Sequence, residues 1–98
     1  MGRTMKNIEP ETEDLLKLAF DVKEFKKTET FGGSLFDFQL ETKNGMVSVY
    51  FEDYGKFYHF YATPSDDVWT IISSGNQFKH FKNAVRKLKQ QIAKWENS

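Results

Sequence analysis

The sequence predicts a single α+β domain in which two helices pack on a four-stranded antiparallel β-meander, in the order α-β-β-β-β-α. Apolar residues recur at helical spacing near both ends of the chain, and two alternating runs flank Asn44-Gly45. The connections between the expected elements are short, which favours neighbouring strands in sequence order. The 98 residues match the size of one domain. We expect this domain over residues 10–98, preceded by a flexible leader over residues 1–9.

The first expected element is a helix over residues 10–25. Pro10 suits the first helical position, and acidic residues follow it where the helix dipole favours them. The apolar stripe of this helix advances in steps of three, four and three residues: Leu15, Leu18, Val22 and Phe25. The pair Gly32-Gly33 then predicts a break before the sheet.

The clearest signal is a β-hairpin around Asn44-Gly45, a pair that favours a type I′ turn. With these two residues as the loop, the expected partners are Leu40 with Val49, Phe38 with Phe51, and Phe36 with Asp53. This register gathers the apolar residues on one face: Phe36, Phe38, Leu40, Val47, Val49 and Phe51. The opposite face is polar, and it sets Asp37 across from Glu52.

The stretch FYHFY (residues 57–61) predicts a third strand with aromatic rings on both of its faces. A two-residue loop at Tyr54-Gly55 turns the even-numbered residues of this stretch to the core and the odd-numbered ones outward. A three-residue loop ending at Gly55 reverses that assignment. A fourth strand is expected over residues 68–72, with Trp69 on its outer face.

The closing helix is expected over residues 77–96, with Asn76 or Ser74 as its cap. Its apolar stripe is Phe78, Phe81, Val85, Leu88, Ile92 and Trp95. Across the helix runs a set of cations that we call the basic stripe: Lys79, Lys82, Arg86 and Lys89. The two helices either cover one sheet face together, which leaves the other face open, or take one face each, which buries the rings of residues 57–61.

The composition excludes several classes of protein. The absence of cysteine excludes disulfide frameworks, thiolate catalysis and cysteine-based zinc sites. The apolar runs are too short for a membrane span or a signal peptide, so we expect a soluble, cytoplasmic protein without a membrane partner. The formal net charge is zero, but residues 1–55 carry −4 (seven Lys/Arg, eleven Asp/Glu) and residues 56–98 carry +4 (seven against three). Two such poles suit self-association or an oppositely charged protein partner.

Catalytic signatures are lacking in the sequence. Neither His59 nor His80 has a partner at a catalytic spacing, and the two serines before the closing helix are explained by a helix cap. The glycines mark turns rather than a phosphate-binding loop. The predicted pair of Asp37 and Glu52 offers only oxygen ligands, without a loop of metal-ligand spacing. We therefore expect no enzyme activity, no cofactor and no metal site.

The aromatic residues of the second sheet face predict a binding role. Aromatic side chains are enriched at protein interfaces and often dominate their energetics. The expected anchors are Tyr50, His59, Tyr61 and Trp69, with the basic stripe as an electrostatic flank. The sequence thus predicts a non-enzymatic module that associates with another protein or with a second copy of itself.

Single-stranded nucleic acid is the alternative partner. Bases would stack on the same rings while lysines track the phosphates. A strand meander followed by a helix is similar, in the order of its elements, to some single-stranded DNA-binding coactivator domains. However, the domain is neutral, and Asp37, Glu41 and Glu52 on the ring-bearing face would repel phosphate.

Overall fold

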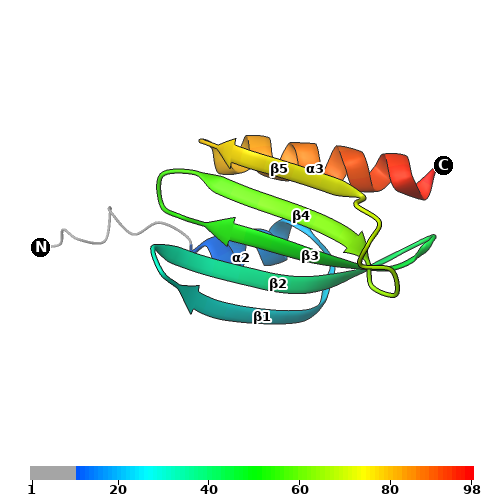
Figure 1. Cartoon of the computed structure of the whole chain (residues 1–98), viewed down its shortest axis with the longest axis horizontal. Coiled ribbons are helices and arrows are strands. Elements are labelled where there is room, and N and C mark those ends of the chain that lie inside the picture. The colour runs from blue at the N-terminus through cyan, green and yellow to red at the C-terminus, as the bar shows by residue number, and fades with distance from the viewer. Residues whose placement is uncertain (1–10) are drawn as a thin grey trace, which may run out of the picture.

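The computed structural model describes residues 11–98, so the predicted leader lies outside the described residues. The elements are α2 (Thr12–Ala19), β1 (Val22–Thr30), β2 (Gly33–Thr42), β3 (Gly45–Asp53), β4 (Tyr58–Pro64), β5 (Ser73–Phe78) and α3 (Phe81–Glu96) (Figure 1). The five strands form one antiparallel sheet in the order β1-β2-β3-β4-β5. The predicted α+β meander is confirmed, with five strands instead of four.

The additional strand is β1, where the sequence suggested the second half of a helix. The helical prediction is wrong beyond Ala19, because residues 22–30 pair with β2 instead. A β-bulge between Val22 and Glu24 explains the misleading pattern. The extra residue lets Val22 and Phe25, three positions apart, both face the core from a strand. Leu18, a member of the predicted helical stripe, is 84% exposed.

The β2–β3 hairpin forms with a register two residues away from the prediction. The observed partners are Leu40 with Val47, Phe38 with Val49, and Phe36 with Phe51. A type I′ turn needs positive φ at both Asn44 and Gly45, but only Gly45 has one, at +109°. The Asn44 side chain instead donates a hydrogen bond of 2.8 Å to the Trp95 carbonyl oxygen, at the end of α3. The loop is therefore Lys43-Asn44, closed by the pair Thr42 and Gly45.

The two-residue shift leaves the two faces of the hairpin unchanged but changes which residues pair across the strands. Because strand faces repeat every two residues, the predicted apolar and polar faces are both retained. The individual partners change, so Asp37 lies across from Tyr50 and Glu52 lies across from Leu35. The predicted opposition of Asp37 and Glu52 is therefore wrong.

The structure decides the faces of β4, and it places the last strand after the predicted residues 68–72. Phe60 pairs with Phe51 and is buried, whereas Tyr61 pairs with Tyr50 on the other face. These are the faces expected for the two-residue loop, but the loop itself is Gly55-Lys56 rather than Tyr54-Gly55, because the Tyr54 N–H donates a hydrogen bond of 3.0 Å to the Phe57 carbonyl oxygen. The predicted strand over residues 68–72 is instead a connection, and the strand β5 follows it. At Gly75 an added Cβ would lie 2.4 Å from the Phe60 ring, so glycine lets β5 pass closely over that ring. The closing helix consequently begins at residue 81 rather than 77.

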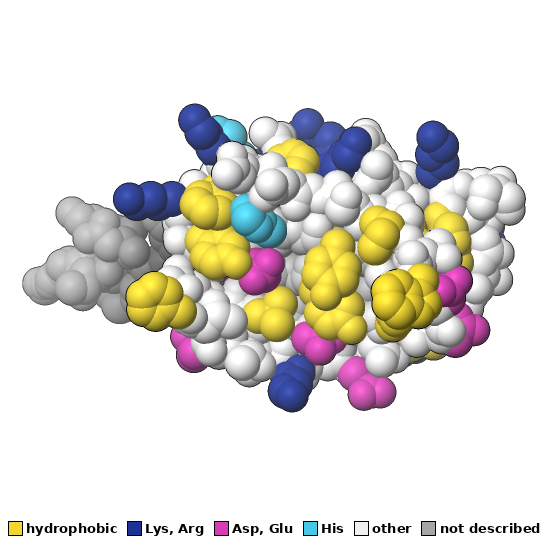
Figure 2. Space-filling view, in the orientation of Figure 1, with side chains coloured by type: hydrophobic (Ala, Val, Ile, Leu, Met, Phe, Trp, Pro, Cys, Tyr) yellow, Lys and Arg dark blue, Asp and Glu magenta, His cyan; other side chains and the backbone are white. Residues whose placement is uncertain are grey.

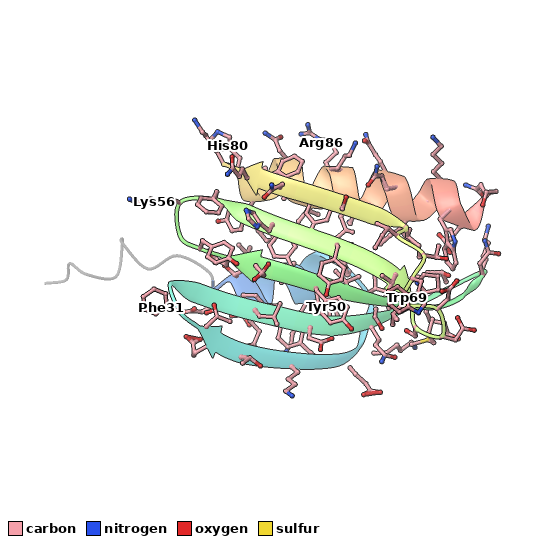
Figure 3. All side chains as sticks on the ribbon, in the orientation of Figure 1. Phe31, Tyr50, Lys56, Trp69, His80 and Arg86 are labelled. Atoms are coloured by element: carbon pink, nitrogen blue, oxygen red, sulfur yellow. The ribbon has the colours of Figure 1, made fainter. Side chains whose placement is uncertain are left out.

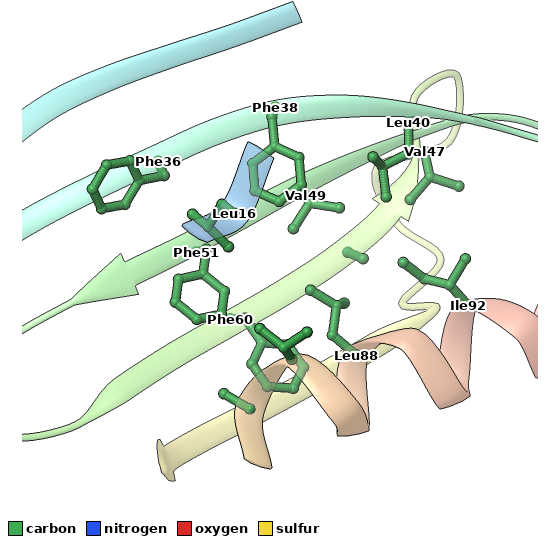
Figure 4. Packing of buried hydrophobic residues seen from close by; sticks show 13 residues of the cluster. Leu16, Phe36, Phe38, Leu40, Val47, Val49, Phe51, Phe60, Leu88 and Ile92 are labelled. Atoms are coloured by element: carbon green, nitrogen blue, oxygen red, sulfur yellow. The ribbon is translucent and has the colours of Figure 1, made fainter. Parts of the chain in front are cut away.

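Both helices pack on the same face of the sheet (Figures 1 and 4). The strands contribute the predicted apolar set, joined by Phe60 and Ala62 of β4. From the helices come Leu16 of α2 and, from α3, Ala84, Val85, Leu88 and Ile92. The arrangement in which the helices sandwich the sheet is excluded, and neither helix covers the second face. Within residues 11–98, no helix is both long enough and apolar enough to cross a membrane.

Candidate functional site: the open sheet face

The face that neither helix covers, here called the open face, carries the polar set of the hairpin and the outward residues of β4. Figure 2 shows hydrophobic side chains and carboxylates interspersed on it, whereas lysine and arginine side chains gather along the edge above α3. The alternation of β2, β3 and β4 fixes which side chains point outward. Sheet order then sets Asp37, Tyr50 and Tyr61 side by side on three neighbouring strands.

Tyr50 and Tyr61 form the centre of this face. Their rings stack across the strands with centroids 4.7 Å apart and an interplanar angle of 22°. Tyr61 is 43% exposed, so the outer surface of the pair is available to a partner. Two of the four predicted aromatic anchors are thus brought into direct contact.

Carboxylates surround the tyrosine pair. Burial raises the pKa of Tyr61 above its usual value of 10.0, and the charges of Tyr50, Glu52 and Asp37 raise it further. The same carboxylates would stabilise a cation placed against the rings, because the coulombic interaction then has the opposite sign. The centre of the open face is therefore aromatic and electronegative.

The raised pKa of Tyr61 predicts a loss of stability in alkali. Below about pH 10 the phenol is neutral in both the folded and the unfolded chain, so stability is independent of it. Above that pH the unfolded chain releases the proton first, binds fewer protons than the folded chain, and is favoured. We expect the free energy of unfolding to fall less between about pH 9 and about pH 11 in Tyr61→Phe than in the wild type. Urea titrations at both pH values measure this difference, and parallel losses in the two proteins would contradict it.

His59 lies in a second aromatic group on the open face. Its ring packs 5.1 Å from Tyr54 and 5.0 Å from Phe57, centroid to centroid. The side chain is half-buried, and its Nε2 atom has no hydrogen-bond partner among the described residues. The Tyr54 hydroxyl donates a hydrogen bond of 2.6 Å to Glu52, and this bond is the main cause of a raised pKa of Tyr54. The predicted anchor His59 is thus packed between neighbours rather than fully free.

Trp69 lies apart from the tyrosines, in the connection between β4 and β5 (Figure 3). The side chain is 92% exposed. Asp67 organises this connection by accepting hydrogen bonds from the Trp69 backbone N–H at 3.2 Å and from the Thr70 hydroxyl at 2.6 Å. The large apolar ring is thereby held out into solvent by an ordered loop rather than by the predicted strand.

The basic stripe lies on the helical side of the molecule. Lys79 precedes α3, and the other three members stand on the helix. Lys89 approaches the Phe20 ring, 5.4 Å from its centroid, which orients this edge of α3 toward the surface between the helices. The rings therefore stand on the open face, whereas three members of the basic stripe stand on a helix that packs on the other face of the sheet.

A hollow of about 180 Å³ extends the open face toward β1. Glu24, Lys26, Asp37 and Gln39 line it beside the β-bulge. Across residues 11–98, no group of three or more histidine, aspartate or glutamate side chains is placed to hold a metal ion. The hollow and the tyrosine pair share Asp37 as a neighbour, so one partner side chain could reach both.

Tyr54 belongs to the aromatic group of the open face, although its position in the sequence predicts only a turn residue. Its short distance to Glu52 along the sequence is the signal that indicates their hydrogen bond. Comparisons of the chain with protein-family models, with curated proteins and with solved structures give no match.

Proposed function

We propose that this domain is a non-enzymatic binding module that associates with another protein chain through its open sheet face. The observation that carries the proposal is the stacked pair of Tyr50 and Tyr61 on a face that both helices leave uncovered. A tyrosine pair offers rigid contact area at low entropic loss, and Trp69 adds a ring that the fold itself does not bury. Exposed apolar groups of this kind, with a polar surround, are typical of interaction surfaces.

Single-stranded nucleic acid is the weaker candidate partner. Stacking on Tyr61 would bring phosphates close to Asp37 and Glu52, and the basic stripe that could offset this repulsion stands on the other side of the sheet. Binding to labelled single strands tests it directly. Nucleic acid would be favoured over a protein partner by two results together: an affinity that falls steeply with salt, and a loss of binding in the double variant Lys82→Glu with Arg86→Glu.

Site-specific photo-crosslinking tests the proposed function. A photoreactive phenylalanine at position 61 should form a discrete adduct with a protein, either foreign or a second copy, in extracts of the cells that make the chain. The matched control is the same residue at Leu18, which is 84% exposed but stands on α2, on the helical side. Adducts at position 61 but not at position 18 support the proposal. Equal labelling at both positions, or no protein adduct, contradicts it.

The proposal also predicts that the anchors contribute little to folding. Trp69→Ala should leave the thermal midpoint unchanged within error, because the side chain is 92% exposed. Tyr61→Ala removes one cross-strand pair and should lower stability by about 1 kcal/mol or less. Thermal and urea unfolding measure both variants. A loss of about 3 kcal/mol or more in either one would identify its ring as core and contradict an interface role.

A further inference from the structure

We infer that the occupant of the open face is the basic stripe of a second copy, so that identical chains associate head to tail. This inference rests on the proposed function and names the partner for the same surface. It is carried by charges that form no ion pair among residues 11–98, by their spacing, and by the placement of α3 on the face opposite the tyrosine pair.

The first observation concerns the carboxylates of the open face. Within residues 11–98 the ion pairs are Lys17 with Glu13, Lys23 with Glu41, and Lys27 with Glu29. Neither Asp37 nor Glu52 takes part in them, although Lys26 lies across from Asp37 on β1. Glu52 accepts a hydrogen bond from the neutral Tyr54 hydroxyl. Two half-buried carboxylates thus border the tyrosine pair without forming an ion pair among the described residues.

The second observation concerns α3. The helix carries five Lys/Arg residues and a single acidic residue, Glu96, which accepts a hydrogen bond from the Lys43 backbone N–H. None of these five cations forms an ion pair within the part of the chain that the structure describes. The first turn has no acidic residue, and the N-cap His80 makes no side-chain hydrogen bond. The positive end of the helix dipole therefore adds to the positive side chains rather than offsetting them.

The spacing of the two charge sets is compatible. Lys82 and Arg86 stand one helical turn apart, a rise of about 6 Å along the axis. Asp37 and Glu52 are separated by one strand and one two-residue step, or about 8 Å from Cα to Cα. Long cationic side chains bridge the difference of about 2 Å, and their stems can lie over the tyrosine rings in cation–π contact.

The placement of the two surfaces determines the symmetry. A two-fold dimer through the open face alone would set carboxylates against carboxylates, which is unfavourable. A two-fold dimer that pairs face with stripe twice needs both surfaces on one side of the molecule, whereas here the stripe stands on a helix that packs on the face opposite the tyrosine pair. Contacts of face with stripe are therefore heterologous, and they propagate into a ring or a filament.

Complementation between two defective variants tests this inference. The face variant carries Asp37→Asn with Tyr61→Ala, and the stripe variant carries Lys82→Ala with Arg86→Ala. In sedimentation equilibrium at low salt, the wild type should self-associate, and each variant alone should remain near 11.5 kDa up to millimolar concentration. An equimolar mixture should form a one-to-one dimer near 23 kDa, twice 11.5 kDa, because one intact stripe meets one intact face. Further growth stops, since the two surfaces left over are both defective.

The matched control carries Lys87→Ala with Lys94→Ala. It removes the same charge from the same helix at two exposed positions outside the basic stripe. The control should self-associate like the wild type, whereas the stripe variant should bind at least about tenfold more weakly. Equal weakening in both would attribute the effect to net charge and overturn the inference.

Three further results would overturn it: a monomeric wild type at every concentration, variants that still associate alone, or a mixture that stays monomeric. If position 61 nevertheless crosslinks a foreign protein, the proposed function stands and only the identity of the partner is wrong. If position 61 crosslinks no protein at all, both fail.

Discussion

Replacing Phe38 with alanine is expected to lower the free energy of unfolding by about 3–5 kcal/mol, the range found for buried aromatic truncations. Phe38 has no exposed surface and lies where β2 meets the helical layer. Its ring contacts Phe20 at 5.6 Å and Phe25 at 5.9 Å between centroids. Removing the ring leaves these side chains facing a cavity that the surrounding sheet cannot fully close.

The effect should be visible as a large thermal shift. Each kcal/mol moves the midpoint of a domain of this size by about 4–8 °C, so we expect a decrease on the order of 20 °C. Trp69→Ala is the matched control, because it removes a larger aromatic ring that is 92% exposed. A Phe38→Ala protein that melts within a few degrees of the control would contradict the described core.

Replacing Gly33 with alanine is the second large expected effect. Gly33 begins β2, and an added Cβ would stand 2.2 Å from the Asp53 carbonyl oxygen and 3.1 Å from the Asp53 carbonyl carbon. Both atoms belong to the backbone of the paired strand, so the clash cannot be relieved by a side-chain rotation. We expect a loss of about 1–3 kcal/mol, as for other overpacking substitutions, together with distortion of the adjacent turn.

The neighbouring glycine supplies the control. Gly32 has φ of +91° and open space around its Cβ position, so Gly32→Ala is opposed by backbone strain alone. That strain amounts to about 1–2 kcal/mol for a single left-handed residue. Urea unfolding of both variants separates the two mechanisms, since only Gly33→Ala should also disturb the amide resonances of Asp53 and Tyr54. Undisturbed resonances at those positions would show that the close approach is absent.

The sequence predicted which strand faces are apolar because that pattern depends only on alternation. The exact strand partners depend on turn geometry. At this turn Asn44 donates a hydrogen bond to the carbonyl oxygen of Trp95, which lies 51 residues further along the chain. Such a tertiary contact cannot be read from the local sequence. Val22 and Phe25 wrongly suggested a helix for a related reason. Their spacing of three is helical unless a bulge intervenes, and the bulge lies in the pairing of β1 with β2, which the local sequence does not contain.

The strand β5 could not be predicted from the local sequence. Its sequence, SSGNQF, contains few residues that favour strands, and its conformation comes from pairing with β4 over the Phe60 ring. For the candidate site, alternation predicted the outward direction of Tyr50, whereas the direction of Tyr61 depended on a turn length that the sequence left open. The position of the basic stripe could not be predicted, because which sheet face a helix covers is set by packing between distant segments.

The strictly sequential sheet has a consequence for the order of events during synthesis. Each strand pairs with its immediate neighbour in the chain, so the hairpins can close one after another as the polypeptide leaves the ribosome. The helix α3 follows all five strands, and until it arrives the apolar side of the sheet lacks the cover of Val85, Leu88 and Ile92. A nascent sheet in this interval is exposed to aggregation. Three lysines on the edge strand β1, Lys23, Lys26 and Lys27, oppose edge-to-edge pairing during that interval.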